Sequence, residues 1–282
     1  MSEFEHIHYK TGDRVARITL DVPETRNALS MELRSEVVTA LKRAERDDDV
    51  SVVLLEGAGP VFCSGYDLRG YSVPEGGFVS EKHFDNWTDQ FARRCVADWM
   101  TIWDLLKPVV CKVQGACLAG GTEVMSMCDI VFAGDNARIG YPPTRGMSSP
   151  DTSFFTQKMG MAHAKYLQLT GASISGKQAA DWGWVAKSFP PEDLDAQVEK
   201  EVAALASIPP DLLALNKRSL NEAYELMGFK NVVQNGIHWH MVSMARVRPN
   251  AGIFQKVAEA DGLKAALEWR DGAFRDIDYK GK

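Results

Sequence analysis

Alternating apolar and polar residues near the start of the chain predict a β-hairpin. Two such runs, residues 5–10 and residues 14–20, lie on either side of the short turn sequence Thr11-Gly12-Asp13. A glycine-containing turn between two alternating runs is typical of a pair of antiparallel strands.

The next apolar pattern has the spacing of an α-helix and is followed by short, continuous apolar runs. Residues 31–46 place apolar side chains on one helical face, and Ser30 is suited to cap the first turn. The runs at residues 51–55, 109–113 and 130–133 are typical of buried strands. Strands that alternate with helical segments predict βα units and a largely parallel sheet.

The second half of the chain is mainly helical by its pattern. Ser175-Gly-Lys-Gln178 has the spacing of a capping box at the start of a helix. Pro190-Pro-Glu-Asp193 combines the proline and the acidic residues that are common where a helix opens. Three further helices are predicted over residues 209–227, 228–246 and 254–269.

The predicted organisation is an α/β core over residues 1–195, which holds the site, and a helical extension over residues 196–282, which supplies subunit contacts. The length of 282 residues fits one large domain with an extension. The composition, with 45% hydrophobic and 25% charged residues, is ordinary for a soluble globular protein. The net charge of −6 argues against a general nucleic-acid-binding protein, because affinity for phosphate backbones comes from clustered Lys and Arg.

The sequence shows no pattern of a membrane protein, a secreted protein or a metal site. No apolar run approaches the roughly 20 residues that span a bilayer, and the start of the chain lacks an apolar signal region. The five cysteines have no C-x-x-C spacing, which indicates thiols in a reducing cytoplasm. His238 and His240 are two residues apart and point to different sides of a helix, so we predict no metal site.

Candidate chemistry is concentrated in three segments that each follow a predicted strand. They are Val61-Phe-Cys-Ser-Gly-Tyr-Asp-Leu68, Gln114-Gly-Ala-Cys-Leu-Ala-Gly-Gly-Thr-Glu123 and Asp135-Asn-Ala-Arg-Ile-Gly-Tyr-Pro-Pro143, the last continuing to Pro150-Asp151. In this order they resemble the crotonase superfamily, the group of the enoyl-CoA hydratases and isomerases. The resemblance runs from Arg26-Asn-Ala-Leu29 to Trp269-Arg270 and Phe274-Arg275 near the end of the chain.

The resemblance implies an α/β fold of the crotonase type, a spiral of ββα units with a C-terminal helical extension. It implies an acyl-CoA substrate, in which coenzyme A enters as part of the substrate, and no permanently bound cofactor. It also implies a homotrimer or a dimer of trimers.

Two glycine-containing turns predict a site for a negatively charged oxygen. Proton transfer beside a thioester carbonyl places charge on that oxygen, and two amide N–H donors in a dry site stabilise it. Glycine permits close backbone approach, and a glycine pair that opens a helix adds the positive end of the helix dipole. The resemblance assigns this role to the N–H groups of Tyr66 and Gly120; alternatively, Gly65 and Gly120-Gly121 only form tight turns.

Glu123 and Asp151 are the candidate acid–base residues. Glu123 lies almost one helical turn beyond Gly120 and can face the same pocket, although a Glu there can also simply stabilise the helix N-terminus. Typical hydratases of the family carry a second Glu after a Gly-x-Pro, where this chain has Pro143, which argues against ordinary two-glutamate hydration. Similarity to dienoyl-CoA isomerases makes Asp151 a second acid or base; the alternative is a turn or N-cap residue.

The resemblance also implies which residues bind the acyl-CoA. Arg26 lies in a stretch that lines the nucleotide pocket in the family, where a cation can pair with phosphate, although a solvated surface Arg is the alternative. Arg270 and Phe274 correspond to a terminal helix that contacts acyl-CoA, often from a neighbouring subunit. The full implied set is Arg26, Ala28, Ser64, Asp67, Leu68, Gly121, Tyr141, Arg270 and Phe274.

An aromatic-rich stretch either shapes the acyl pocket or forms a core helix; it contains Phe78, Phe84, Trp87, Phe91, Trp99 and Trp103. If it lines the pocket, a bulky or cyclic acyl group is expected.

Three functions remain open. The first is a hydratase/isomerase-type enzyme that forms a thioester enolate, with Glu123 as main acid or base and Asp151 as its partner. The second is a hydrolase or carbon–carbon bond enzyme on a β-keto or cyclic acyl-CoA, and the third is a non-catalytic acyl-CoA-binding scaffold.

Overall fold

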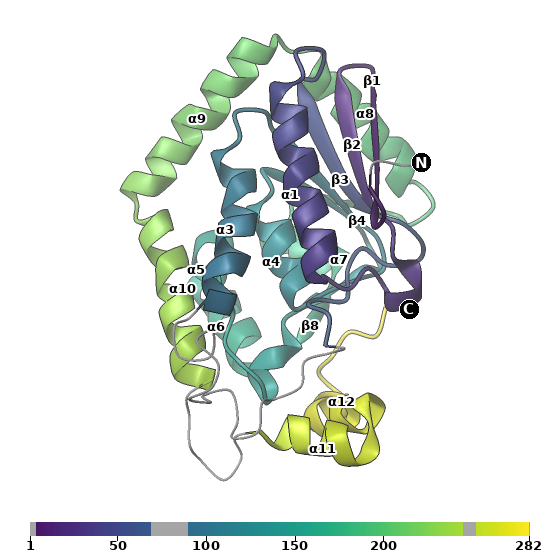
Figure 1. The fold of residues 1–282 in the computed structure, drawn as a ribbon, viewed down its shortest axis with the longest axis vertical. Helices are drawn as coiled ribbons and strands as arrows, with labels where there is room; N and C mark the ends of the chain where they lie inside the picture. The colour runs from purple at the N-terminus through teal and green to yellow at the C-terminus, as the bar shows by residue number, and fades with distance from the viewer. Residues whose placement is uncertain (1–3, 69–89, 245–251, 282) are drawn as a thin grey trace.

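The computed structural model describes residues 4–68, 90–244 and 252–281 as a mixed α/β fold with a parallel-rich sheet, as predicted (Figure 1). The larger sheet has the strand order β1-β2-β3-β4-β6-β9, with β1 Ile7–Gly12, β2 Val15–Leu20, β3 Val52–Gly57, β4 Val109–Val113, β6 Ile130–Gly134 and β9 Lys187–Phe189. The smaller sheet has the order β5-β7-β8, with β5 Ala116–Leu118, β7 Arg138–Gly140 and β8 Ser173–Ser175.

The helices of the described ranges follow the strands in the chain and dominate its second half. They are α1 Met31–Arg46, α3 Gln90–Asp104, α4 Gly120–Met127, α5 Phe155–Lys158, α6 Met161–Thr170, α7 Gly176–Asp181, α8 Leu194–Ala206, α9 Pro210–Leu226, α10 Phe229–Met244, α11 Ile253–Asp261 and α12 Leu263–Asp271. Short 3₁₀ helices occupy η1 Pro23–Thr25, η2 Pro142–Arg145 and η3 Gly272–Phe274. None of the described helices has the length and apolar character needed to cross a membrane.

Strand pairing confirms the predicted hairpin and the parallel sheet. Strands β1 and β2 pair antiparallel, with Ile7 opposite Leu20. Strands β2, β3, β4, β6 and β9 then pair in parallel. Because β3, β4 and β6 are parallel neighbours, the segments that follow them all leave the same edge of the sheet, where ligands of open α/β sheets bind. The three segments with candidate chemistry therefore begin at one edge.

Both faces of the sheet are buried, since alternate residues of one strand pack into two separate clusters. Val53 and Leu55 of β3 belong to the large core formed with α1, α3 and α4. Val52 and Leu54 belong to a second cluster, which α8 covers. This alternation is the expected consequence of the two-residue repeat of a strand.

Two helices begin at the predicted capping residues, whereas a third begins later than predicted. Ser30 accepts a hydrogen bond from the Leu33 amide (3.2 Å), and Ser175 and Gln178 form the predicted capping box. The helix predicted to open at Pro190 begins only at Leu194, because residues 190–193 form a turn closed by a hydrogen bond from the Asp193 amide to the Pro190 carbonyl (2.9 Å).

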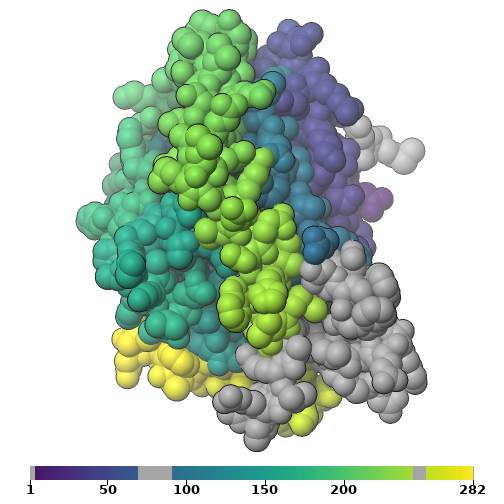
Figure 2. Space-filling model, turned by 90° about the vertical axis from the view of Figure 1, so that its left-hand side faces the viewer, coloured from purple at the N-terminus to yellow at the C-terminus, as the bar shows by residue number. Residues whose placement is uncertain are grey.

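The helix predicted over residues 254–269 is two helices. Gly262 has φ +85°, which ends α11 and redirects the chain into α12. Figure 2 shows α9 and α10 running one after the other over one face of the molecule, with α11 and α12 at its lower end.

Helix α10 packs unusually close to the third candidate segment. A Cβ atom built on Gly236 would lie 2.1 Å from the carbonyl oxygen of Asp151, so only glycine allows this approach. The contact places the second half of α10 beside Asp151.

Asn27 ties the turn after β2 to the loop that carries Tyr66. Its side chain is fully buried, and its Oδ1 accepts a hydrogen bond from the Val22 amide (3.0 Å). Its Nδ2 lies within hydrogen-bond distance of three carbonyls of that loop, at 3.0–3.1 Å, namely those of Ala58, Val61 and Phe62. One buried carboxamide therefore links the turn after β2 to the site loop.

Asn27→Ala should lower the free energy of unfolding by about 2 kcal/mol or more, because buried backbone groups lose their partners. Denaturant titration measures the change. The matched control is Asn221→Ala, which removes a single hydrogen bond to the Trp103 carbonyl and should cost about 1 kcal/mol. Equal effects of the two substitutions would contradict the role given to Asn27.

Candidate active site

A short parallel bridge between Leu29 and Tyr66 fixes the direction of the Tyr66 amide. The Leu29 amide donates to the Gly65 carbonyl (2.8 Å), and the Asp67 amide donates to the Leu29 carbonyl (3.3 Å). Successive amides of an extended segment point to opposite sides, so the Tyr66 N–H points away from Leu29. Within the described chain this N–H has no hydrogen-bond acceptor.

A second unpaired amide belongs to Gly120, the first residue of α4. The N–H groups of a first helical turn have no acceptor in their own helix, and the described residues offer none to Gly120. A Cβ atom on Gly65 would lie 2.7 Å from Ala119 Cβ and 3.4 Å from Gly120 N, so the two turns are in direct contact. This arrangement can present two N–H donors to one oxygen atom.

Ala119, between β5 and α4, has a strained backbone. Its φ of 52° and ψ of −125° form a combination that residues with a side chain rarely adopt. Its amide donates to the Gly140 carbonyl (3.0 Å), and its carbonyl accepts from the Thr122 amide (2.9 Å) and hydroxyl (2.6 Å). These contacts hold the turn that aims the first amides of α4 at the Tyr66 loop.

Glu123 is fully buried on α4, and both of its carboxyl oxygens are engaged. Oε2 accepts a hydrogen bond from the Tyr66 hydroxyl (2.7 Å), and Oε1 accepts one from the Asp151 amide (2.8 Å). Trp99 Nε1 donates to the same Tyr66 oxygen (3.1 Å). One carboxyl thus connects the first and third candidate segments.

Asp151 is fully buried and pairs with His240 of α10. His240 Nδ1 contacts Asp151 Oδ1 as an ion pair and lies 3.1 Å from the Ser149 carbonyl oxygen. Among the described residues, the other carboxylate oxygen, Oδ2, has no hydrogen-bond partner. Gly236 lies one helical turn before His240, on the same face of α10. Its close contact with Asp151 therefore also places the His240 imidazole beside the Asp151 side chain.

Burial and charge raise the pKa of both Glu123 and His240. Burial and repulsion from Asp151 raise the pKa of Glu123 to about 8, so this carboxyl is mainly protonated at neutral pH. Burial opposes the charged form of His240, but the adjacent Asp151 carboxylate outweighs it and raises the His240 pKa. A protonated Glu123 therefore lies behind an Asp151–His240 ion pair.

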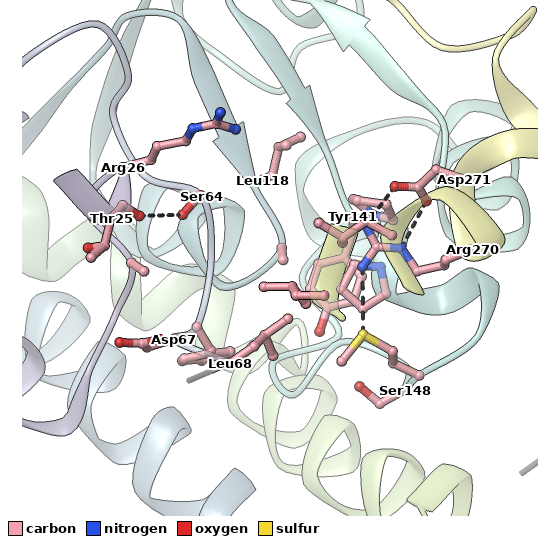
Figure 3. Close-up of a pocket in the computed structure, with 18 of the residues that line it drawn as sticks. Thr25, Arg26, Ser64, Asp67, Leu68, Leu118, Tyr141, Ser148, Arg270 and Asp271 are labelled. Atoms are coloured by element: carbon pink, nitrogen blue, oxygen red, sulfur yellow. Dashed lines mark hydrogen bonds and ion pairs between the residues drawn. The ribbon is translucent and has the colours of Figure 1, made fainter. Parts of the chain in front are cut away.

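A cavity of about 490 Å³ adjoins these groups. The predicted site residues that line it are Arg26, Ala28, Ser64, Tyr66, Asp67, Leu68, Tyr141, Asp151 and Arg270. Figure 3 shows Arg26, Ser64 and Leu68 on one side of the cavity, with Tyr141 and Arg270 on the other. Segments far apart in the sequence therefore form one cavity.

Four predicted site residues do not line this cavity: Gly120, Gly121, Glu123 and Phe274. Gly120 lies under the Tyr66 ring, since its Cβ would be 2.8 Å from Tyr66 Cε2, and Gly121 lies against Cys63. Phe274 packs beneath the guanidinium of Arg145 (4.2 Å). Arg145 is itself 1% exposed and forms an ion pair with Asp278 (2.6 Å) that anchors the end of the chain.

Pro143, Phe91 and His240 also line the cavity. Pro143 lines the cavity and is buried, so the position of the second Glu of typical hydratases offers no acid here. Of the aromatic stretch, Phe91 lines the cavity, whereas Phe78, Phe84 and Trp87 lie outside the described residues. His240 was missed, because helical spacing gives no signal of a partner on a distant segment.

Comparison with known proteins agrees with this fold over nearly its whole length. The sequence profile of the enoyl-CoA hydratase/isomerase family matches residues 10–260. An enoyl-CoA hydratase of Mycobacterium smegmatis of known crystal structure is 32% identical, with a TM-score of 0.89 and coverage of 98% of this chain and 96% of that chain. An enoyl-CoA hydratase/isomerase of Xanthobacter autotrophicus is 32% identical, with a TM-score of 0.88 and coverage of 96% and 99%.

The chain is also similar to a relative whose name states a more specific activity. The 1,2-epoxyphenylacetyl-CoA isomerase of Escherichia coli is 30% identical over 232 residues, which are 79% of this chain and 84% of that protein. The family profile includes all three segments with candidate chemistry. The chain therefore belongs to the enoyl-CoA hydratase/isomerase family, the crotonase superfamily, and is an acyl-CoA enzyme of the hydratase/isomerase type.

Proposed function

We propose that the protein isomerises an enoyl-CoA by moving a proton along the acyl chain through a thioester enolate. The observation that carries this proposal is the carboxylate of Asp151, which lines the cavity and whose Oδ2 has no hydrogen-bond partner within the described chain. It is therefore available to take a proton from a bound molecule. His240 of α10 lies beside it and forms an ion pair with its Oδ1.

In the proposed reaction Asp151 removes the proton between the thioester carbonyl and the double bond of a 3-enoyl-CoA. The electron pair moves to the carbonyl oxygen, which accepts hydrogen bonds from the N–H groups of Tyr66 and Gly120. Loss of one such donor typically costs about 10²–10³ in rate. Return of a proton to the far carbon of the dienolate then gives the 2-enoyl-CoA.

Hydration is the less favoured reaction at this site. Addition of water in typical relatives needs two acids that hold the water, and Pro143 stands at one of these positions. The Tyr66 side chain separates Glu123 from the cavity, and both carboxyl oxygens of Glu123 already take part in hydrogen bonds. Asp151 is then the acidic group of the predicted pair that faces the bound molecule.

The basic and the apolar side chains of the cavity wall are proposed to bind different parts of the acyl-CoA. Arg26 and Arg270 line it and can pair with phosphate oxygens of coenzyme A. The apolar wall favours a bulky acyl group and includes Leu68, Phe91, Leu118, Tyr141 and Met147. No permanently bound cofactor is needed for this chemistry.

The proposal also covers the oligomeric state and the cellular location. We propose a homotrimer or a dimer of trimers, supported by exposed apolar side chains on α9, which include Leu215 (64% exposed) and Leu220 (62%). We also propose a cytoplasmic location, supported by the five cysteines, which are all free thiols.

Asp151→Asn should lower the turnover of a 3-enoyl-CoA by about 10²–10⁴-fold, because the base is lost. The rise of the enoyl-thioester absorbance follows isomerisation, and its decay with crotonyl-CoA follows hydration. Asp181→Asn, on the exposed side of α7, is the matched control and should leave turnover unchanged. Rapid hydration of crotonyl-CoA that depends on Glu123 and not on Asp151 would contradict the proposal.

A second candidate function is cleavage of a carbon–carbon bond in a β-keto or cyclic acyl-CoA. The observation that favours it is the Asp151–His240 pair, because the carboxylate of this pair can take a proton from an attacking water. Turnover of a β-dicarbonyl thioester without turnover of any 3-enoyl-CoA would favour this function over isomerisation.

Glu123→Gln should stabilise the protein more at high pH than at low pH. With the Glu123 pKa raised to about 8, the folded protein holds a proton that the unfolded chain releases near its ordinary value. The resulting stability is complete below about pH 4.3 and is lost as the pH rises through the folded pKa. The difference in Tm between variant and wild type should therefore grow from about pH 5 to about pH 9.

The control for this pH series is Glu222→Gln, which changes an exposed glutamate paired with Arg218 on α9. Its Tm difference should stay nearly constant over the same range. A constant difference for Glu123→Gln as well would contradict the raised pKa.

A further inference from the structure

Glu123 reaches the cavity only through the side chain of Tyr66. The Glu123 side chain is fully buried and absent from the cavity wall, whereas Tyr66 forms part of that wall. The Tyr66 ring covers Gly120, and its hydroxyl lies 2.7 Å from Glu123 Oε2. A bound acyl group therefore meets the phenol before it can meet the carboxyl.

Burial, and then the neighbouring Cys95, Glu123 and Asp151, raise the pKa of Tyr66, so the phenol keeps its proton until a strongly basic carbon is present. Trp99 Nε1 donates a hydrogen bond to the phenol oxygen (3.1 Å), which stabilises negative charge there. The guanidinium carbon of Arg34 lies 5.6 Å from the centre of the ring. Arg34 is buried and is held by an ion pair with Asp98, so the cation stays in place.

The hydrogen bonds of the Tyr66 hydroxyl leave its proton available to a ligand. A phenol has one O–H to donate and two lone pairs to accept with. Trp99 uses one lone pair. With Glu123 ionised, the Tyr66 hydroxyl donates to Oε2 across the 2.7 Å contact; with Glu123 protonated, the direction of this hydrogen bond reverses and the carboxyl donates to the second lone pair. The Tyr66 O–H is then directed to the cavity, since its other neighbours already donate to it.

We propose that the Tyr66 hydroxyl is the catalytic acid that protonates the dienolate, and that Glu123 is a positioning residue that resupplies this proton. The inference rests on the proposed isomerisation. The O–H bond of Tyr66 breaks as a C–H bond forms at the far carbon of the dienolate, whose electron pair makes that bond. The Glu123 proton then moves to the Tyr66 oxygen. Asp151 releases the removed proton to solvent in the cavity, and a solvent proton returns to Glu123 through the Tyr66 hydroxyl.

This role differs from the one that the Tyr66 backbone has in the same site. Tyr66→Phe keeps the amide that faces the thioester oxygen and keeps the ring that covers Gly120, but removes the hydroxyl. The substitution therefore separates enolate formation, which needs Asp151 and the two amides, from protonation of the dienolate. Exchange of the substrate's acidic proton in deuterium oxide reports the first step, and formation of the 2-enoyl-CoA reports both.

The test compares these two rates for a 3-enoyl-CoA in the full-length protein. Tyr66→Phe should lower isomerisation by about 10²-fold or more while proton exchange into recovered substrate stays within about 3-fold. Asp151→Asn should abolish both. Glu123→Gln should lower isomerisation in the wild-type background and cause no further loss in the Tyr66→Phe background, because it acts through the phenol.

The matched control is Tyr166→Phe, which alters a tyrosine on α6 that is 40% exposed, and unchanged affinity for hexanoyl-CoA verifies that Tyr66→Phe is folded. Normal isomerisation by Tyr66→Phe would overturn this inference alone. An equal loss from Glu123→Gln in both backgrounds would overturn it too, since the carboxyl would then act directly. Absence of exchange and isomerisation in the wild type would contradict the proposed function and the inference together.

Discussion

The site depends on the direct contact of two backbone turns, one after β3 and one after the β4–β5 segment. Gly65, with φ +107°, lies so close to Ala119 that a Cβ atom would sit 2.7 Å from the Ala119 side chain. Any larger residue at this position would push the Tyr66 amide away from the Gly120 amide. The parallel neighbours β3 and β4 bring the turns to one edge of the sheet, and the strained Ala119 completes the contact.

This contact has a consequence for the side chains as well as for the amides. It places the Tyr66 ring over the first residue of α4 and its hydroxyl on Glu123, one turn into the helix. One residue can therefore serve the thioester oxygen with its backbone and the acyl chain with its side chain. Glu123 becomes a protonated group of the interior, and Asp151 with His240 becomes the charged pair at the cavity.

Local features of the fold were predictable from the sequence because they depend on residues close together in the chain. The β1–β2 hairpin, the buried strands and the caps at Ser30 and Ser175 all follow from short patterns. Local reasoning failed where a single backbone angle decides the outcome, as at Gly262, which divides one predicted helix into two.

The composition of the site was only partly predictable. Family resemblance pointed to Tyr66, Gly120, Glu123 and Asp151, and the structure brings these residues together. No sequence pattern indicates that the Tyr66 side chain separates Glu123 from the cavity. None points to His240 either, because its contact with Asp151 depends on how α10 packs at Gly236. Such contacts are set by tertiary packing, which sequence spacing does not encode.

The central claim is that the amides of Tyr66 and Gly120 hold the thioester oxygen while Asp151 faces the adjacent carbon. A crystal structure with a saturated acyl-CoA such as hexanoyl-CoA tests it most directly. The account predicts a thioester oxygen within about 2.7–3.1 Å of both amide nitrogens, the adjacent carbon beside Asp151, and the acyl chain against the Tyr66 hydroxyl. A thioester oxygen bound elsewhere, or a Tyr66 ring moved aside so that Glu123 touches the acyl group, would contradict it.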